Sequence, residues 1–357
     1  MTDLNNLDEM RKLDAGKMLD ITMNYHIQWQ EAVKLGNAFK VPSEYKNIKN
    51  LLITGLGGSA IGGDLLSSYL SDKMRVPIFV NRNYTVPRWV NNKTLVVAVS
   101  YSGNTEETLS AFNQAVSKKA KVACLTSGGK LDEYARQNNI PVCRLSQGYP
   151  PRTALGYLFV PVLILFQKLR FVSNCTRAIN ETITLLSGLS RSYGPERLVE
   201  NNPAKQLALK FANKVVFIIG VQDSTSVVAL RWKCQLNENA EVFAVSNALP
   251  EMNHNEIVGW GGQMPDILKQ IHVLFLSDSK DNPQIKRRME ITRNIMSAHA
   301  CSADVISSEG QSDLARLMSL IYLGDFVSIY MAFLSNLDPT PVKLITRLKN
   351  ELKEKGE

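Results

Sequence analysis

The chain is poor in the residues that build metal centres and disulfide frameworks. Only four histidines occur in 357 residues, and the five cysteines are odd in number and show no CxxC spacing. Zinc sites and disulfide-rich secreted domains both depend on closely spaced cysteine or histidine residues. We therefore expect no metal and no disulfide framework, and we interpret the cysteines as buried free thiols in a reducing compartment.

Signals for membranes, export and nucleic acids are also scarce. The first residues are polar and acidic, unlike a signal peptide, and the longest apolar stretch, residues 154–166, is too short to span a bilayer. The net charge of +8 comes from basic residues spread along the chain, whereas nucleic-acid-binding proteins gather them in one motif. We expect a cytoplasmic protein with no nucleic-acid or membrane partner, whose charge attracts anions.

The most informative stretch is a short turn at residues 100–105 that carries three hydroxyl groups. An apolar run precedes it and a helical pattern follows, so the turn opens a helix. The hydroxyls of Ser100, Ser102 and Thr105, the free backbone N–H groups and the helix dipole all favour an anion. The turn contains no Lys or Arg, which suits a phosphate monoester better than a triphosphate with Mg²⁺. The alternative is that these residues only cap the helix.

A second turn, at residues 55–59, has the sequence Gly-Leu-Gly-Gly-Ser between an apolar strand and a helix. Glycines such as Gly58 allow the backbone to approach a ligand closely, and Ser59 adds a hydroxyl. The spacing only partly matches the dinucleotide fingerprint, and the next strand ends without an acidic residue for a ribose. Alternating strands and helices predict a parallel sheet with ligands at the carboxyl ends of the strands. Both turns can then face one ligand.

The pattern of strands and helices divides the chain into four parts. We expect an N-terminal helical arm at 1–46, a phosphate-binding α/β domain at 47–153, connecting helices at 154–203, and a second α/β domain with C-terminal helices at 204–357. The second domain repeats the strand–turn–helix pattern of the first without its glycine-rich turn. This indicates a duplicated domain whose second copy has a function other than phosphate binding.

Three charged side chains are candidates for catalysis. Arg152 follows two prolines, which gives a rigid turn able to present a guanidinium to negative charge, unless it only forms a surface ion pair. Glu238 near a helix end is a possible base, although most such glutamates are solvated. His254, between two asparagines, has the surroundings of a histidine that titrates near neutrality, or it is a structural turn residue. Its spacing from Glu256 does not match a zinc site.

Taken together, these motifs give the chain a family resemblance. It resembles the bifunctional phosphoglucose/phosphomannose isomerases, which have two sugar isomerase (SIS) domains. The matching stretches, spread in order over most of residues 50–350, are Gly55-Leu-Gly-Gly-Ser59, Ser100-Tyr-Ser-Gly-Asn-Thr105, Pro150-Pro-Arg152, Asn237-Glu238-Asn239, Leu249-Pro-Glu-Met-Asn-His254-Asn-Glu256, and Asp338-Pro-Thr-Pro-Val342 with Lys349. The resemblance implies an α/β fold in which each SIS domain is a parallel sheet flanked by helices in a flavodoxin-like, three-layer arrangement.

The resemblance also implies roles for individual residues. Those that would hold the phosphate of a hexose 6-phosphate are Gly58, Ser59, Ser100, Ser102 and Thr105. Glu238 would move a proton between C1 and C2, and Arg152 would stabilise the cis-enediolate. His254, donated by the neighbouring subunit of a homodimer, would assist ring opening. Lys349 would contact the sugar as a further ring-opening aid, with Lys343 as the rival lysine. No cofactor and no metal would be needed.

The expected activity is therefore an aldose–ketose isomerisation. Glucose 6-phosphate, mannose 6-phosphate or both would be interconverted with fructose 6-phosphate through a cis-enediol. One alternative is a non-catalytic sugar-phosphate-binding SIS regulator, but residues 1–46 contain no basic recognition helix. A second alternative is the isomerase half of an amidotransferase that makes glucosamine phosphate. Such a protein needs a glutaminase domain that begins with Cys, whereas Thr2 follows the first Met here. Isomerases of heptose or arabinose phosphates mostly have a single domain.

Overall fold

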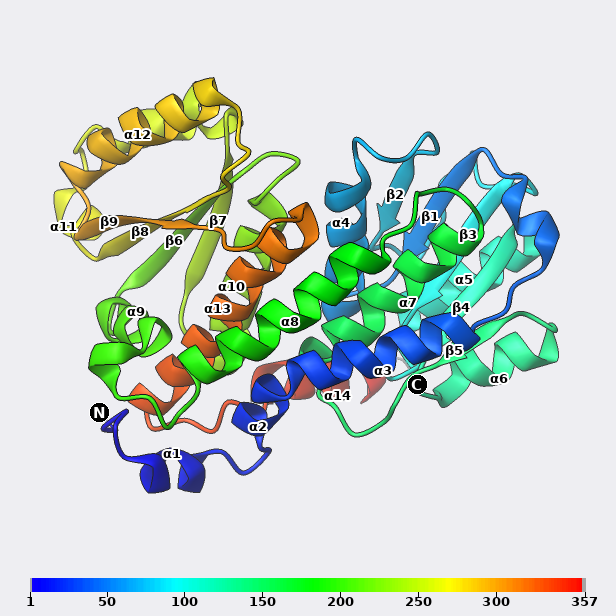
Figure 1. Ribbon diagram of the computed structural model, residues 1–357, viewed down its shortest axis with the longest axis horizontal. Coiled ribbons are helices and arrows are strands. Elements are labelled where there is room, and N and C mark those ends of the chain that lie inside the picture. The colour runs from blue at the N-terminus through cyan, green and yellow to red at the C-terminus, as the bar shows by residue number, and fades with distance from the viewer. Residues whose placement is uncertain (1, 355–357) are drawn as a thin grey trace. The chain divides into compact units, whose positions relative to one another are not determined.

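The computed structural model describes residues 2–354, except for the side chain of Lys353, and divides into two compact units (Figure 1). Unit 1 comprises Met1–Met23, Gly188–Glu309 and Ser319–Glu357, and unit 2 comprises Asn24–Ser187 and Gly310–Met318. The units group residues by contact, so the domain boundaries expected at residues 46, 153 and 203 stay a prediction.

Unit 2 is built on a five-stranded parallel sheet with the order β2-β1-β3-β4-β5. The strands are β1 (Asn50–Thr54), β2 (Ile78–Asn81), β3 (Thr94–Val99), β4 (Lys121–Thr126) and β5 (Val142–Arg144). All six residues of the central strand β3 are buried, as expected for a strand that is covered on both faces.

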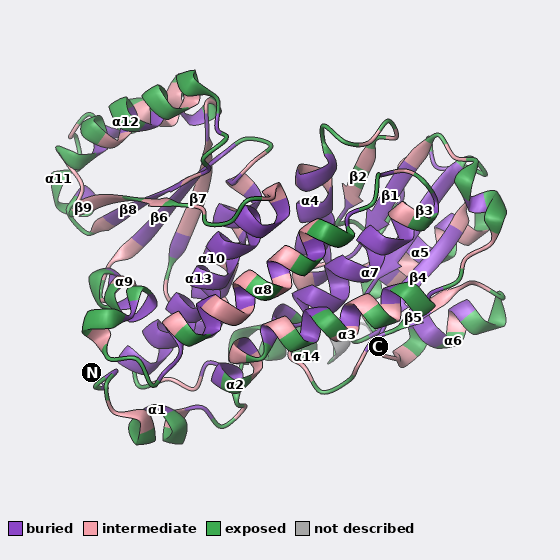
Figure 2. Cartoon of the chain, in the orientation of Figure 1, coloured by how far each residue is buried: buried purple, intermediate pink, exposed green. Residues whose placement is uncertain are grey.

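Helices cover both faces of this sheet. On one face, α5 (Glu106–Ser117) and α6 (Gly129–Gln137) pack on the apolar side chains of the central strands. On the other face lies α4 (Gly58–Leu70), whose Gly63 rests on Ile53. Helix α7 (Leu155–Lys168) packs on α4 and on α3 (Tyr25–Ala38), and Figure 2 shows it buried along most of its length.

Unit 1 contains a four-stranded parallel sheet with the order β7-β6-β8-β9. The strands are β6 (Val215–Val221), β7 (Ala244–Leu249), β8 (Ile271–Ser277) and β9 (Ser302–Ser307). This order repeats that of the first four strands of unit 2, so the expected repetition of the α/β pattern is confirmed. The helices of this part are α9 (Pro203–Phe211), α10 (Ser226–Ala240), α11 (Pro265–Leu268), α12 (Pro283–Ser297) and α14 (Lys343–Glu354).

Helix α13 (Asp313–Leu334) is, among the described residues, the one helix long and apolar enough to cross a membrane by length and composition. Its apolar stretch is entirely buried in the protein. In unit 1 it packs closely on α10, because the Trp232 indole donates a hydrogen bond to the Leu320 carbonyl at 2.8 Å. A Cβ at Gly324 would lie 2.3 Å from the same indole nitrogen, so this contact requires glycine.

The N-terminal arm is helical, as expected, and its α-helices are α1 (Leu7–Leu13), α2 (Met18–Met23) and α3. Residues 2–23 belong to unit 1 and are bound there by polar contacts. The Lys205 ammonium donates to the Leu4 carbonyl at 2.6 Å, and the Tyr322 hydroxyl donates to the Thr22 carbonyl at 2.8 Å. The start of the chain is thus part of the core of unit 1.

Helix α8 (Thr176–Tyr193) lies in the segment 154–203 that was expected to hold connecting helices, and it ends where Gly194 and Pro195 follow, because proline cannot continue a helix. One expectation is corrected. The cysteines are all free, but Cys234 is half-buried and Cys301 is exposed, so the expectation of buried thiols is wrong for these two. Short 3₁₀ helices occupy Ser43–Lys46, Pro151–Thr153 (η2), Val199–Asn201, Glu251–His254 (η4) and Glu256–Trp260 (η5).

Candidate active site

The two turns singled out in the sequence lie side by side in unit 2. Strands β1 and β3 are neighbours, and the chain leaves them in opposite directions across the sheet, to β2 and to β4. Ligands of open parallel sheets bind outside the carboxyl ends of the strands at such a switch point. The turn at 55–59 follows β1 and the turn at 100–105 follows β3. A Cβ at Gly55 would lie 2.8 Å from the Val99 carbonyl oxygen, so the structure brings the two turns together as expected.

The hydroxyl groups of the 100–105 turn bond mainly within the turn. The Oγ of Ser100 lies 2.9 Å from the Oγ1 of Thr105 and accepts the backbone N–H of Gly103 at 3.1 Å. Thr105 is the N-cap residue of α5, but its side chain does not cap the helix, so the capping alternative is wrong for Thr105. Ser102 is exposed, and its hydroxyl oxygen accepts the N–H of Asn104 at 3.3 Å. Two glutamates in the first turn of α5 partly offset the positive end of its dipole.

The glycine-rich turn is shaped by conformations that other residues rarely adopt. Gly57 has a φ of +54°, where a side chain would be strained. A Cβ at Gly58 would lie 2.8 Å from the carbonyl oxygen of Pro151, so the start of α4 contacts the turn that carries Arg152. Ser59, in the first turn of α4, is buried beside these contacts.

Arg152 belongs to the same cluster. It lies in η2 and is only 6% exposed, so the interpretation as a surface ion pair is wrong. The segment before it is tied to the hydroxyl turn by Tyr101, whose hydroxyl donates to the Ser146 carbonyl at 2.7 Å and accepts the N–H of Tyr149 at 3.0 Å. Burial raises the pKa of Tyr101, which keeps this hydroxyl protonated. Tyr101 was not named as a site residue from the sequence, although its position between two serines of the turn could have indicated one.

Glu238 and His254 lie at opposite ends of strand β7 in the second sheet. Glu238 is half-buried in the last turn of α10, and its neighbour Asn237 accepts the N–H of Ala244 at 3.1 Å, at the start of β7. His254 ends η4, which follows the far end of β7, and it is exposed. A strand of six residues spans about 20 Å. Within one chain, the structure therefore does not bring these two side chains together.

Exposed apolar residues follow His254 along the chain. Val258 is 77% exposed, and Met264 and Ile267 are both more than half exposed. Glu256 is held differently, since its carboxylate accepts a hydrogen bond of 2.5 Å from the amide of Asn247 in β7. Three large apolar side chains are thus exposed in the segment that follows His254.

The C-terminal lysines lie on α14. Lys343 and Lys349 are both exposed, and so are the apolar residues Leu344, Leu348 and Leu352 of the same helix. A cavity of about 540 Å³ beside the helix is lined by Lys343 but not by Lys349.

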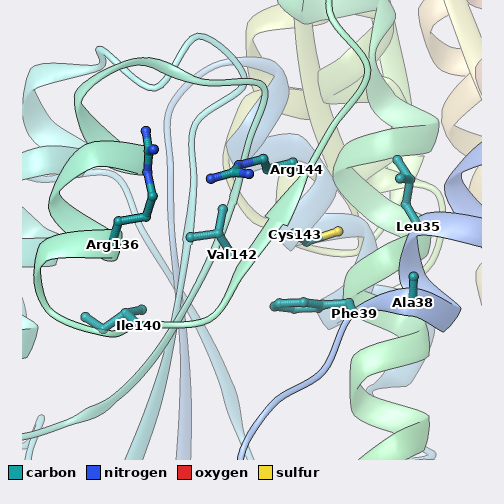
Figure 3. A pocket seen from close by; sticks show the side chains of 8 residues that line it. All are labelled: Leu35, Ala38, Phe39, Arg136, Ile140, Val142, Cys143 and Arg144. Carbon is teal, nitrogen blue, oxygen red and sulfur yellow. The ribbon is translucent and has the colours of Figure 1, made fainter.

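One pocket of unit 2 is lined by neither of these turns. Its volume is about 470 Å³, and Figure 3 shows it beside β5, with Phe39 and Cys143 on one side. Arg136 and Arg144 also line it, and both pair with Asp132, at 2.8 and 3.1 Å. None of the proposed phosphate residues lines it. Within residues 2–354, no group of three or more His, Cys, Asp or Glu side chains could hold a metal ion.

Comparison with known proteins identifies families and relatives that the chain is similar to. Residues 44–142 match the SIS domain, and residues 200–352 match the bacterial phospho-glucose isomerase C-terminal SIS domain. The chain is 45% identical over 337 residues to a bifunctional phosphoglucose/phosphomannose isomerase of Caldicellulosiruptor bescii, covering 94% of this chain and 99% of that protein. It is 35% identical over 340 residues to a protein of the same name from Aquifex aeolicus, covering 91% and 99%.

Solved structures show the same fold. A hypothetical protein from Thermus thermophilus superposes with a TM-score of 0.75, covering 98% of this chain and 94% of that chain. Its sequence identity to this chain is only 14%, so the likeness concerns the fold alone.

Proposed function

The chain belongs to the bifunctional phosphoglucose/phosphomannose isomerase family, and on that premise we propose that it interconverts fructose 6-phosphate with glucose 6-phosphate, mannose 6-phosphate or both. Membership confirms the resemblance seen in the motifs. The observation that carries the proposal for this chain is the pair of turns at the β1/β3 switch point, which offers hydroxyls and backbone N–H groups to an anion.

The phosphate of the substrate is bound by neutral donors. The residues assigned to it are Gly58, Ser59, Ser100, Ser102 and Thr105. The close packing of Gly55 on Val99, directly before the second turn, supports a common role for the two turns. Binding energy from a phosphate remote from the reacting carbons orients the sugar and lowers the barrier of the chemical step.

Proton transfer and charge stabilisation are assigned to two side chains. Glu238 removes the proton from C2 of the aldose, or C1 of the ketose, and returns it to the other carbon. Arg152 stabilises the enediolate that forms between these steps, because a guanidinium in a largely buried position acts strongly on developing negative charge. Glu238 and Arg152 account for the transfer of the proton between C1 and C2, and the hydroxyl proton leaves one oxygen and is restored to the other by exchange with water. The proposal includes no cofactor and no metal.

Ring opening is assigned to His254 of a second copy of the chain, in a homodimer. Two observations support this. Glu238 and His254 lie at opposite ends of strand β7, and exposed apolar residues follow His254. Lys349 is proposed as a second group that aids ring opening, with Lys343 as its rival. Because hexose 6-phosphates are metabolites of the cytoplasm, we expect the enzyme to act there.

Proton NMR of fructose 6-phosphate in D₂O tests the proposal, with purified protein and EDTA present. Glucose 6-phosphate and mannose 6-phosphate that both carry deuterium at C2 would support a metal-independent enediol route with dual specificity. Formation of only one aldose would restrict the activity to that sugar. Binding of fructose 6-phosphate without conversion would favour the sugar-phosphate-binding regulator instead.

A further inference from the structure

Helix α3 sends one polar side chain into the core of unit 2. Gln28 is 2% exposed, and its amide makes two hydrogen bonds with residues that are more than a hundred positions away in sequence. Its Nε2 donates to the carbonyl of Thr153 at 2.9 Å, and its Oε1 accepts the N–H of Gly156 at 2.8 Å. The nitrogen and the oxygen of one side-chain amide thus both bond the short backbone segment from Thr153 to Gly156.

This segment is where η2 becomes α7. The N-cap residue of α7 is Ala154, which has no side-chain oxygen to accept the first N–H groups of the helix. Gln28 accepts one of them from a different helix. A Cβ at Gly156 would lie 2.7 Å from the Gln28 oxygen and 2.9 Å from the Trp29 ring, so glycine is required at residue 156 for α3 to come this close.

Thr153 is the residue directly after Arg152. Its N–H and its hydroxyl both bond the carbonyl of Pro150 at 2.9 Å, which closes the turn around the arginine. Its own carbonyl is then fixed by Gln28. On the preceding side of the turn, Tyr101 holds the N–H of Tyr149. The backbone that carries Arg152 is therefore anchored on both sides, once from the hydroxyl turn and once from α3.

We propose that Gln28 is a positioning residue for Arg152. The proposal rests on the proposed function, in which Arg152 stabilises the enediolate. A guanidinium lowers the barrier only when it is already aimed at the place where charge develops. A shift of about 1 Å can cost a factor of about 10² in rate. Through Gln28, the N-terminal arm, which carries no family motif, contributes to the reaction.

The first test is Gln28→Leu, which keeps the size of the side chain and removes both hydrogen bonds. We expect kcat for fructose 6-phosphate to fall about 10- to 100-fold, with KM nearly unchanged because the phosphate turns are untouched. The matched control is Tyr45→Phe. It removes one buried hydrogen bond of 2.9 Å, to the carbonyl of Val122 near the start of β4, and should leave kcat unchanged.

A second variant distinguishes lost positioning from lost stability by the pH dependence of its kcat. In Gln28→Glu the ionised carboxylate can still accept the N–H of Gly156 but cannot donate to the carbonyl of Thr153. A protonated carboxyl can donate. The kcat of this variant relative to the wild type, measured at each pH, should therefore rise as the pH is lowered, whereas that of Gln28→Leu should stay flat.

Coupling to Arg152 separates the possible outcomes. If Gln28 acts through Arg152, the loss in Arg152→Lys and the loss in Gln28→Leu should not multiply in the double variant. A folded Gln28→Leu protein with wild-type kcat would overturn the role of Gln28 while leaving the proposed function intact. Full activity of Arg152→Lys would instead remove the proposed role of Arg152, and with it the basis of this inference.

Discussion

The hydroxyl oxygens of Ser100 and Thr105 lie 2.9 Å apart across the turn that joins β3 to α5. This bond closes the turn without using the N–H groups at the start of the helix. The exposed Ser102 hydroxyl accepts the N–H of Asn104 at 3.3 Å within the same turn. These bonds hold the turn in shape, so little reorganisation of its backbone is needed when the substrate binds.

Removing two of these hydroxyls should weaken substrate binding. Each hydrogen bond to a charged group contributes about 1.5–3 kcal/mol, so Ser102→Ala combined with Thr105→Ala should raise KM for hexose 6-phosphates at least tenfold. Steady-state kinetics with fructose 6-phosphate measures this. Ser117→Ala, at the far end of α5, is the control and should leave KM unchanged. An unaltered KM in the double variant would place the phosphate elsewhere.

Glu238→Gln should abolish proton transfer with little effect on the fold. The amide keeps the shape of the side chain but cannot act as a base, so kcat should fall by about 10²–10⁴. Loss of deuterium incorporation from D₂O is the direct measurement. Glu290→Gln, an exposed position on α12, serves as the control. Retained turnover in Glu238→Gln would exclude Glu238 as the base.

Mixing two inactive variants should restore activity if subunits share a site. Glu238→Gln and His254→Ala are each expected to be inactive alone. In a mixture that exchanges subunits, half of the dimers combine both variants and hold one intact site, which gives about a quarter of wild-type activity. The assay is turnover after joint unfolding and refolding. No recovery would mean that Glu238 and His254 do not act across a dimer.

The buried ion pair between α10 and α13 should matter more for stability than an exposed pair. The Arg231 guanidinium bonds both carboxylate oxygens of Asp325, at 3.1 and 2.9 Å. Asp325→Asn leaves a buried charge and should lower the free energy of unfolding by about 3–5 kcal/mol. Arg347→Ala breaks the exposed pair with Glu351 and should cost at most about 1 kcal/mol. Urea denaturation measures both, and equal losses would contradict this account.

Acid should destabilise the protein through His272. Burial lowers the pKa of His272, and Asp304, 3.1 Å away, only partly opposes this effect. The unfolded chain then binds the proton more readily than the folded one. Stability is therefore lost as the pH falls below about 6.5, the ordinary histidine pKa, at up to about 1.4 kcal/mol per pH unit. Denaturant curves between pH 7.5 and 5 should show a smaller loss for His272→Asn than for the wild type; parallel losses would contradict the assignment.

Much of the fold could be predicted because its strands are uninterrupted apolar runs. The apolar run before the hydroxyl turn forms β3, residues 94–99. The apolar signal misleads where such residues are not in the core. Val242 and Phe243 precede β7, but Phe243 is 71% exposed and the strand begins at Ala244. Most side chains within β7 are only half-buried, so this strand has no strong apolar signal.

The candidate site could be predicted only in part. Its turns stand out because glycines and hydroxyls occur between a strand and a helix, which is a local pattern. Tyr101 and Gln28 act through bonds to residues 45 and more than 120 positions away, and no local pattern reports such partners. The separation of Glu238 from His254 likewise follows from the direction of α10 and β7 and not from the 15 residues between them.

During synthesis, the two units cannot be completed at the same time. The hydroxyl of Tyr322 bonds the carbonyl of Thr22 across 300 residues of sequence. A ribosome that adds about 5–20 residues per second needs roughly 15–60 s to make that stretch. Asn24–Ser187, most of unit 2, has left the ribosome well before then. The sheet with the hydroxyl turn can thus form on the nascent chain, while residues 2–23 await partners that are translated later, such as Tyr322.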